Sequence, residues 1–384
     1  MVLRGFTVTV ILVLFGVSSN AKSSTGPRPI LQVGESVVLA GTEPGRLAFP
    51  LIESRPVEVR STYLRGLPDT IQYRRGWDYQ IDKNGQLSRL PKSRIPDYRG
   101  NPSFGLASFD HYKIPDSGNS PFMVYVDYFY ADEKNSRLKP KTVGSEALTG
   151  VQAKLKAGRN LKIIAFGDSV TAGGETSMPS LIYWERWAQH LRDKYPRANI
   201  QTVKSGHEGD LTEDGLKRID ADVIGQHPDL VLIAFGLNDY NKGPPEINMS
   251  KWELRRAKWA RSWAKLIQQP PPAQQNGIGR VDYFANNLRE MIDRVKSKTG
   301  AEVILLSALQ PNPKWKFSDG DMARIAAITE SVAIEKRCAY VDVFDAWNEY
   351  SKRKKPEDLL SNNANHPNDF GHWIYFQALA ALAL

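Results

Sequence analysis

The chain has 384 residues, a length that suits one large domain or two ordinary ones. Apolar residues make up 41% of it, enough to bury a real core, and the single cysteine, Cys338, excludes an internal disulfide as a source of stability. The formal net charge is +9 at pH 7, but the basic residues are spread along the chain, as on an ordinary solvated surface. We therefore predict no nucleic-acid partner.

The first 21 residues are typical of a secretory signal peptide. Arg4 supplies a basic start, residues 6–17 form a short apolar run, and residues 19–21 read Ser-Asn-Ala, a small-residue cleavage site. The apolar run is shorter than a comfortable membrane span, and an uncleaved anchor is the alternative. We predict a signal peptide at 1–21 and a secreted or periplasmic protein.

Residues 28–140 predict a small all-β domain, either a sandwich or a jelly-roll. Short segments of alternating polar and apolar residues recur between turn signals, and residues 82–85 (Asp-Lys-Asn-Gly) predict a hairpin turn because Asn-Gly tolerates positive φ. Four aromatic residues could stack on sugars or belong to the core, and we favour the core for them: Trp77, Tyr79, Tyr125 and Tyr128.

From residue 148 to residue 384 the pattern changes to alternating strands and helices, which predicts an α/β domain. Apolar strands are expected at 161–166, 199–203, 229–235, 301–309 and 339–344. Helices are expected at 179–194, 213–226, 281–298, 319–336 and 369–382. Continuous apolar strands between helices indicate a parallel sheet covered on both faces, in which ligands bind beyond the carboxyl ends of the strands.

Polar and small residues follow these strand ends. Ser169 follows the first strand in a Gly-Asp-Ser turn, Gly206 and Gly209 follow the second, and Asn238 follows the third in a Gly-Leu-Asn-Asp turn. His366 lies in a polar loop before the last predicted helix. A serine hydroxyl becomes a good nucleophile when a base such as histidine removes its proton, and backbone N–H groups with an asparagine amide can stabilise the resulting oxyanion. These residue types therefore favour acyl transfer.

The four motifs occur in the order found in the SGNH/GDSL hydrolase superfamily, which the chain resembles over about residues 150–384. The resemblance implies a flavodoxin-like three-layer sheet, no metal or organic cofactor, and ester hydrolysis through an acyl-enzyme. It makes Ser169 the nucleophile and His366 the base. It assigns the oxyanion hole to Ser169, Gly209 and Asn238.

One position departs from the family pattern. The family usually has an aspartate three residues before the histidine, where this chain has Asn363. An asparagine oxygen can still accept the Nδ1 proton of His366 and orient its ring, but it supplies no negative charge. Three interpretations stay open: a Ser-His pair assisted by Asn363 or a backbone carbonyl, which we favour; a carboxylate from Asp358 or Asp369; or a weakened enzyme. His372 lies within the last predicted helix, where packing is the expected role.

Residues 241–280 are a basic, tryptophan-containing insertion directly after the Asn238 motif. Trp252, Trp259 and Trp263 fall near one face of a predicted helix, and basic residues fill much of the remainder. Such a helix could cover the active site as a lid, pack on the sheet domain, or lie on an anionic membrane, the least favoured of the three.

Together these features predict a secreted serine esterase that hydrolyses an acyl ester, with acetyl the first choice, on a carbohydrate. The substrate would be a small molecule or a polysaccharide. A lipase or thioesterase of the same fold is the nearest alternative. A polysaccharide-binding protein that has lost turnover is the alternative outside the enzymes. The oligomeric state is left open.

Overall fold

The computed structural model describes residues 28–131, 140–240, 278–318 and 320–384. The predicted signal peptide and residues 241–277 of the predicted insertion lie outside these ranges, so both remain predictions. Within the described part of the chain, no helix is both long and apolar enough to cross a bilayer.

The centre of the molecule is a six-stranded sheet in the order β10-β9-β11-β12-β13-β8. Five strands are parallel: β9 (Leu161–Gly167), β10 (Ile200–Gly206), β11 (Leu230–Ala234), β12 (Glu302–Leu306) and β13 (Ala339–Val341). The short β8 (Thr142–Val143) pairs antiparallel with β13 at the edge. The runs of Ile, Leu and Val in β9, β11 and β12 are almost wholly buried, as expected of strands covered on both faces.

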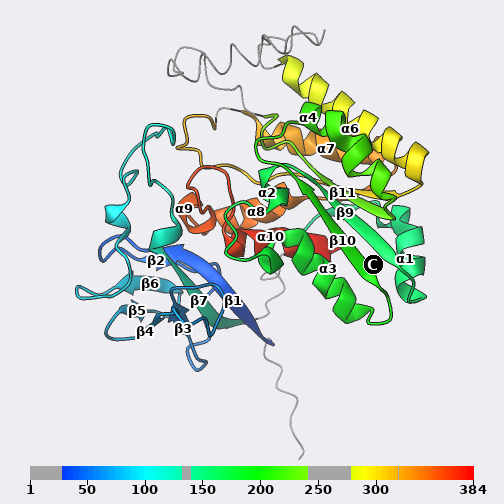
Figure 1. The fold of residues 1–384 in the computed structure, drawn as a ribbon. Coiled ribbons are helices and arrows are strands. Elements are labelled where there is room, and N and C mark those ends of the chain that lie inside the picture. The colour runs from blue at the N-terminus through cyan, green and yellow to red at the C-terminus, as the bar shows by residue number, and fades with distance from the viewer. Residues whose placement is uncertain (1–27, 132–139, 241–277, 319) are drawn as a thin grey trace, which may run out of the picture.

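Helices cover both faces of this sheet. The helices α4 (Thr212–Asp222), α6 (Ile278–Thr299) and α7 (Met322–Glu335) lie on one side, and α3 (Tyr183–Lys194) and α10 (Asp369–Ala380) lie on the other (Figure 1). Taken in chain order, the parallel strands lie in the order 2-1-3-4-5, which is the flavodoxin-like order. The predicted three-layer α/β fold is confirmed.

Four shorter helices were not predicted: α1 (Thr149–Lys156), α2 (Ser169–Ala172), α8 (Val343–Ser351) and α9 (Pro356–Leu359). The strand expected at 339–344 is too long, because β13 ends at Val341 and α8 begins at Val343. Asp342 caps α8 there, its side chain accepting a hydrogen bond from the Asp345 N–H at 2.9 Å. Short 3₁₀ turns occupy Tyr98–Gly100, Ser120–Phe122, Ser145–Leu148, Pro179–Leu181 and Ile224–Gln226.

The N-terminal region is antiparallel β structure, as predicted. One sheet has the order β1-β7-β3-β4, from Pro29–Val38, Met123–Ala131, Glu58–Arg60 and Gln72–Tyr73. The other has the order β2-β6-β5, from Gly45–Arg46, Gln86–Arg89 and Tyr79–Ile81. Both sheets contribute to one apolar core that contains Tyr79 and Tyr128, and Tyr125 is also buried. Trp77 differs from the expectation, because it is 77% exposed.

The N-terminal region is fastened to the α/β region. The Val38 N–H donates to Asp358 Oδ1 at 2.8 Å, and Lys354 forms a fully buried ion pair with Glu35 at 3.0 Å. Met123 and Tyr125 belong to the same apolar cluster as the core of the six-stranded sheet. In Figure 1 this region lies beside α8, α9 and α10, the part of the chain that leads into and out of the His366 loop.

Candidate active site

Ser169 begins α2 at the carboxyl end of the central strand β9. Asp168 caps this helix, its side chain accepting from the Val170 N–H at 3.0 Å. The helix packs so closely over the end of β10 that a methyl group at Gly206 would lie 2.1 Å from the Ala172 backbone nitrogen, which explains the glycine there. Ser169 thus lies where the strand order reverses, the usual position of ligand sites in such sheets.

His366 lies in the loop between α9 and α10. Its backbone N–H donates to Asn362 Oδ1 at 2.8 Å, and its carbonyl accepts from the Ser361 N–H at 2.9 Å. A methyl group at Gly174 would lie 3.2 Å from His366 Nδ1 and 3.2 Å from the Ser169 carbonyl oxygen. The fold therefore brings the His366 ring against the turn that follows Ser169. Among the described residues, no hydrogen bond joins the Ser169 hydroxyl to this ring.

The His366 ring is partly shielded from water. Burial first, and the charge of His111 second, lower the pKa of His366 to about 4. The imidazole is therefore neutral at pH 7, the form that can accept a proton. His372 has the packing position expected of it: it is fully buried in α10, and its Nδ1 accepts from the Tyr183 N–H at 3.4 Å.

Asn363 lies at the centre of a buried hydrogen-bond network. Its Oδ1 accepts from the side-chain amides of Asn312 at 2.9 Å and Asn119 at 3.2 Å, and its Nδ2 donates to Ser103 Oγ at 2.7 Å. Its backbone has φ of +62°, a conformation that asparagine tolerates better than most residues. The hydrogen bonds among the described residues include none from Asn363 to His366. Its observed partners instead hold the loop that carries His366.

The two carboxylates considered as alternatives also have other partners. Asp358 accepts from the Val38 and Lys355 N–H groups at 2.8 and 3.0 Å, and so ties the loop to β1. Asp369 Oδ1 accepts from the Ser177 N–H at 2.9 Å. Burial raises the pKa of both carboxyls. Neither forms a hydrogen bond to His366 within the part of the chain that the structure describes.

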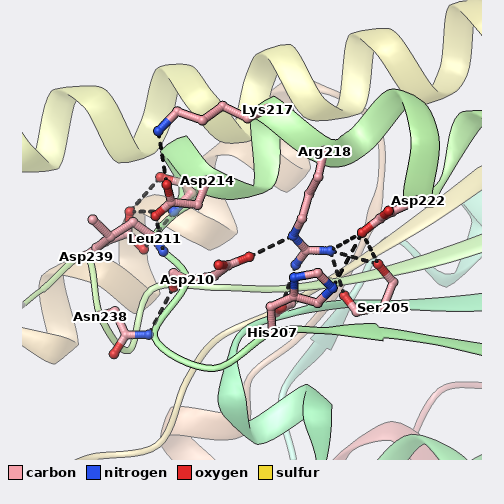
Figure 2. A network of polar contacts seen from close by, with 12 residues as sticks. Ser205, His207, Asp210, Leu211, Asp214, Lys217, Arg218, Asp222, Asn238 and Asp239 are labelled. Carbon is pink, nitrogen blue, oxygen red and sulfur yellow. Dashed lines mark hydrogen bonds and ion pairs between the residues drawn. The ribbon is translucent and has the colours of Figure 1, made fainter. Parts of the chain in front are cut away.

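Gly209 and Asn238 lie in neighbouring loops beyond β10 and β11. Gly209 has φ of +74°, which favours glycine, and a methyl group there would meet no described atom within 4 Å. The Asn238 side-chain amide donates to the Asp210 carbonyl at 2.9 Å (Figure 2). An amide carries two N–H donors, so this bond fixes the side chain and uses one of them. The loop bearing Gly209 and the Asn238 side chain are thus held together.

Arg218, on α4, anchors this loop and was not predicted. It donates to Asp210 Oδ2 at 2.7 Å, to the Gly167 carbonyl at 2.9 Å and to the Ser205 carbonyl at 3.1 Å. It also pairs with Asp222 at 2.8 Å, as Figure 2 shows. One guanidinium therefore joins the ends of β9 and β10 to the loop. Only its spacing of four from Asp222 is visible in the sequence.

Asp239 holds the same loop from the other side. Its carboxylate accepts from the Thr212 N–H at 3.0 Å and from the Thr212 hydroxyl. Burial raises the pKa of Asp239 to about 6 and that of Asp168 to about 7. Both carboxyls bond to backbone N–H groups of the turns, which is a structural role.

Comparisons with known proteins identify the family of the α/β region. The GDSL-like lipase/acylhydrolase family matches residues 165–374, more than half of the chain. An acetylxylan esterase of Geobacillus stearothermophilus is 24% identical over 232 residues, 58% of this chain and 94% of that protein. An arylesterase of Vibrio mimicus is 36% identical over 169 residues, 41% of this chain and 78% of that protein.

Among solved structures, a two-domain esterase active on acetylated mannans, crystallised with mannopentaose, is similar with a TM-score of 0.46 and 20% identity. The match covers 61% of this chain and 52% of that one. The family match runs from within β9 to within α10, and it includes the Gly-Asp-Ser turn, the Gly209 loop, the Asn238 loop and the His366 loop. The chain therefore belongs to the GDSL-like lipase/acylhydrolase family and is a carboxylic ester hydrolase.

Proposed function

We propose that this protein is a secreted serine esterase that removes acetyl groups from a carbohydrate, with Ser169 as nucleophile and His366 as base. The observation that carries the proposal is the meeting of four segments at one sheet edge. The Ser169 turn, the Gly209 loop and the Asn238 loop follow three adjacent strands, and the His366 ring lies against Gly174.

In this mechanism His366 removes the hydroxyl proton of Ser169 while Oγ attacks the acyl carbon. The Ser169 and Gly209 N–H groups and the second N–H of the Asn238 amide stabilise the oxyanion. The intermediate collapses when His366 returns the proton to the leaving sugar oxygen. Water then attacks the acyl-enzyme as His366 takes its proton, and His366 returns that proton to Ser169 Oγ when acetic acid leaves.

Asn363 acts in this proposal on the loop rather than on the proton. Its side chain binds Asn119, Asn312 and Ser103, and the loop so held carries His366. The neutral state of His366 follows from its burial, so the ring needs no carboxylate to be a proton acceptor at pH 7. The proposed mechanism therefore uses a Ser-His pair on a loop that Asn363 holds.

The substrate proposal rests on the acetylxylan esterase named above, and the secretion proposal rests on residues 1–21. The test measures hydrolysis of p-nitrophenyl acetate, butyrate and octanoate, and release of acetate from acetylated xylan, with Ser169→Ala as control. We expect Ser169-dependent turnover that falls as the acyl chain lengthens. A preference for octanoate would favour a lipase. No Ser169-dependent turnover on any ester would overturn the proposal, and polysaccharide binding would then become the first candidate function.

A further inference from the structure

A segment of the N-terminal region reaches the loop that carries His366. The Phe109 N–H donates to the Lys314 carbonyl at 2.9 Å, and the Lys316 N–H donates to the Phe109 carbonyl at 2.8 Å. Farther along, the Asn119 N–H donates to the Ser361 carbonyl at 2.6 Å. The segment is thus held at both ends against the α/β region.

This segment builds an aromatic cluster that continues to the His366 loop. Phe109, Trp315 and Phe317 are buried and share an apolar cluster with Ala364, which lies two residues before His366. Toward the surface the cluster is capped by His111, whose ring centroid lies 5.5 Å from that of Trp315 and 5.9 Å from that of Phe317.

Tyr112 is the exposed end of the cluster. Its ring centroid lies 3.9 Å from that of His111 and 5.9 Å from that of Phe317, yet the residue is 69% exposed. Contacts with two rings therefore hold an open aromatic face in place. A fixed ring loses little conformational freedom when a ligand stacks on it, which favours binding.

His111 adds a hydrogen-bond donor. The Trp315 indole N–H donates to His111 Nδ1 at 2.8 Å, so that nitrogen carries no proton. Burial lowers the pKa of His111, and the neutral ring must then carry its proton on Nε2. Through Trp315, His111 is joined to the apolar cluster that contains Ala364 of the His366 loop. An N–H donor thus lies beside the exposed Tyr112 ring, at the end of the cluster that reaches the His366 loop.

We propose that Tyr112 and His111 form a binding site for a sugar ring of the substrate, the carbohydrate that carries the ester. Aromatic faces stack on the apolar C–H face of a pyranose, and the His111 Nε2–H can donate to one of its hydroxyls. The proposal rests on the proposed function, and it gives the N-terminal region a role in choosing the alcohol part of the ester. Phe109, Trp315 and Phe317 position the two binding residues.

The test measures binding separately from turnover. Acetylated and deacetylated xylo- and manno-oligosaccharides are titrated by calorimetry into the full chain with Ser169→Ala, and into the same chain with Tyr112→Ala, His111→Phe or Trp77→Ala. Trp77 is the matched control, an exposed aromatic residue between β4 and β5, which lie well away from α9 in Figure 1. We expect Tyr112→Ala to raise Kd roughly three- to tenfold. Trp77→Ala should leave Kd unchanged.

Two further results decide the proposal. Tyr112→Phe keeps the ring and should bind with the same Kd as the parent, which here is the Ser169→Ala chain. His111→Phe should raise Kd because it removes the donor. Equal Kd values for the parent and Tyr112→Ala, or no binding by the parent to any of these sugars, would overturn the sugar site. If the unmodified protein shows no Ser169-dependent turnover on any ester, the proposed function is overturned instead, so the two failures are distinguishable.

Discussion

The Arg218 guanidinium donates to Asp210 Oδ2 at 2.7 Å, and Asp210 is the residue directly after Gly209. The same guanidinium reaches the Gly167 carbonyl at 2.9 Å, two residues before Ser169. One side chain on α4 thus joins the turn of the proposed nucleophile to the loop of a proposed oxyanion donor. The distance between the Ser169 turn and the Gly209 loop therefore depends on Arg218, which has no direct role in the proposed chemistry.

Arg218→Met is expected to lower kcat roughly 10- to 100-fold while changing KM much less, because it loosens a donor whose complete loss costs about 10²- to 10³-fold. Arg218→Lys can restore one contact and should lie between. Steady-state kinetics on p-nitrophenyl acetate is the measurement. Arg289→Met is the control, since Arg289 pairs with Glu335 on the surface at 2.9 Å. A folded Arg218→Met protein with parental kcat would show that the loop holds without the clamp.

Asn238→Ala is expected to lower kcat by about 10²- to 10³-fold, the usual effect of losing one oxyanion donor. It also frees the Asp210 carbonyl, which accepts the Asn238 amide at 2.9 Å. The exposed amide of Asn160 provides the control, and Asn160→Ala should leave kcat unchanged. If Asn238→Ala retains parental kcat, the oxyanion hole does not include this side chain.

Asn363→Ala is expected to cost much less activity than His366→Ala, which should abolish turnover. The larger effect of Asn363→Ala falls on stability, because Asn119 and Asn312 lose their acceptor and alanine disfavours the φ of +62°. We expect the free energy of unfolding to fall by about 2 kcal/mol or more, measured by urea denaturation. Equal losses of kcat in the two variants would make Asn363 an essential third member of the catalytic group.

The pH dependence of kcat/KM follows from the shielded His366 ring. Burial lowers its pKa to about 4, so the neutral base persists as the pH falls from 7 to roughly 5. We expect an acid limb with a midpoint well below that of an exposed histidine, about 6.5. A midpoint at or above that value would contradict the burial of the base.

Folding must be followed over the same pH range. The pKa values of His366 and His372 are lowered by burial, to about 4 and about 3, so the unfolded chain takes up protons first as the pH falls below about 6.5. This lowers the free energy of unfolding as the pH decreases. The pKa of Asp168, raised to about 7, acts in the opposite direction. Circular dichroism at each pH separates unfolding from titration of the base.

The order of the main strands and helices from residue 161 onward could be predicted because each one has its own pattern of apolar residues within a short segment. Ser169 and Asn238 stood out because they follow strands that were expected to be parallel, and the resemblance to the SGNH/GDSL superfamily singled out Gly209 rather than Gly206. Helix α8 was missed because its first residues, Val343 and Phe344, continue an apolar run, and only the cap by Asp342 separates them from β13. Arg218 was missed because a basic residue on a helix usually faces water.

The sequence by itself determined the α/β fold and the polar strand ends, because both depend on patterns within a few residues or on the rules of parallel sheets. The proposed roles of Ser169, Gly209, Asn238 and His366 came from the resemblance to the SGNH/GDSL superfamily. Only the tertiary structure decided the partners of Asn363, which come from Ser103, Asn119 and Asn312. It also decided that the Phe109–Tyr112 segment reaches the His366 loop. Asn312 lies 51 positions from Asn363, and the other contacts join residues some 200 or more positions apart, so chain folding creates them without leaving a local pattern.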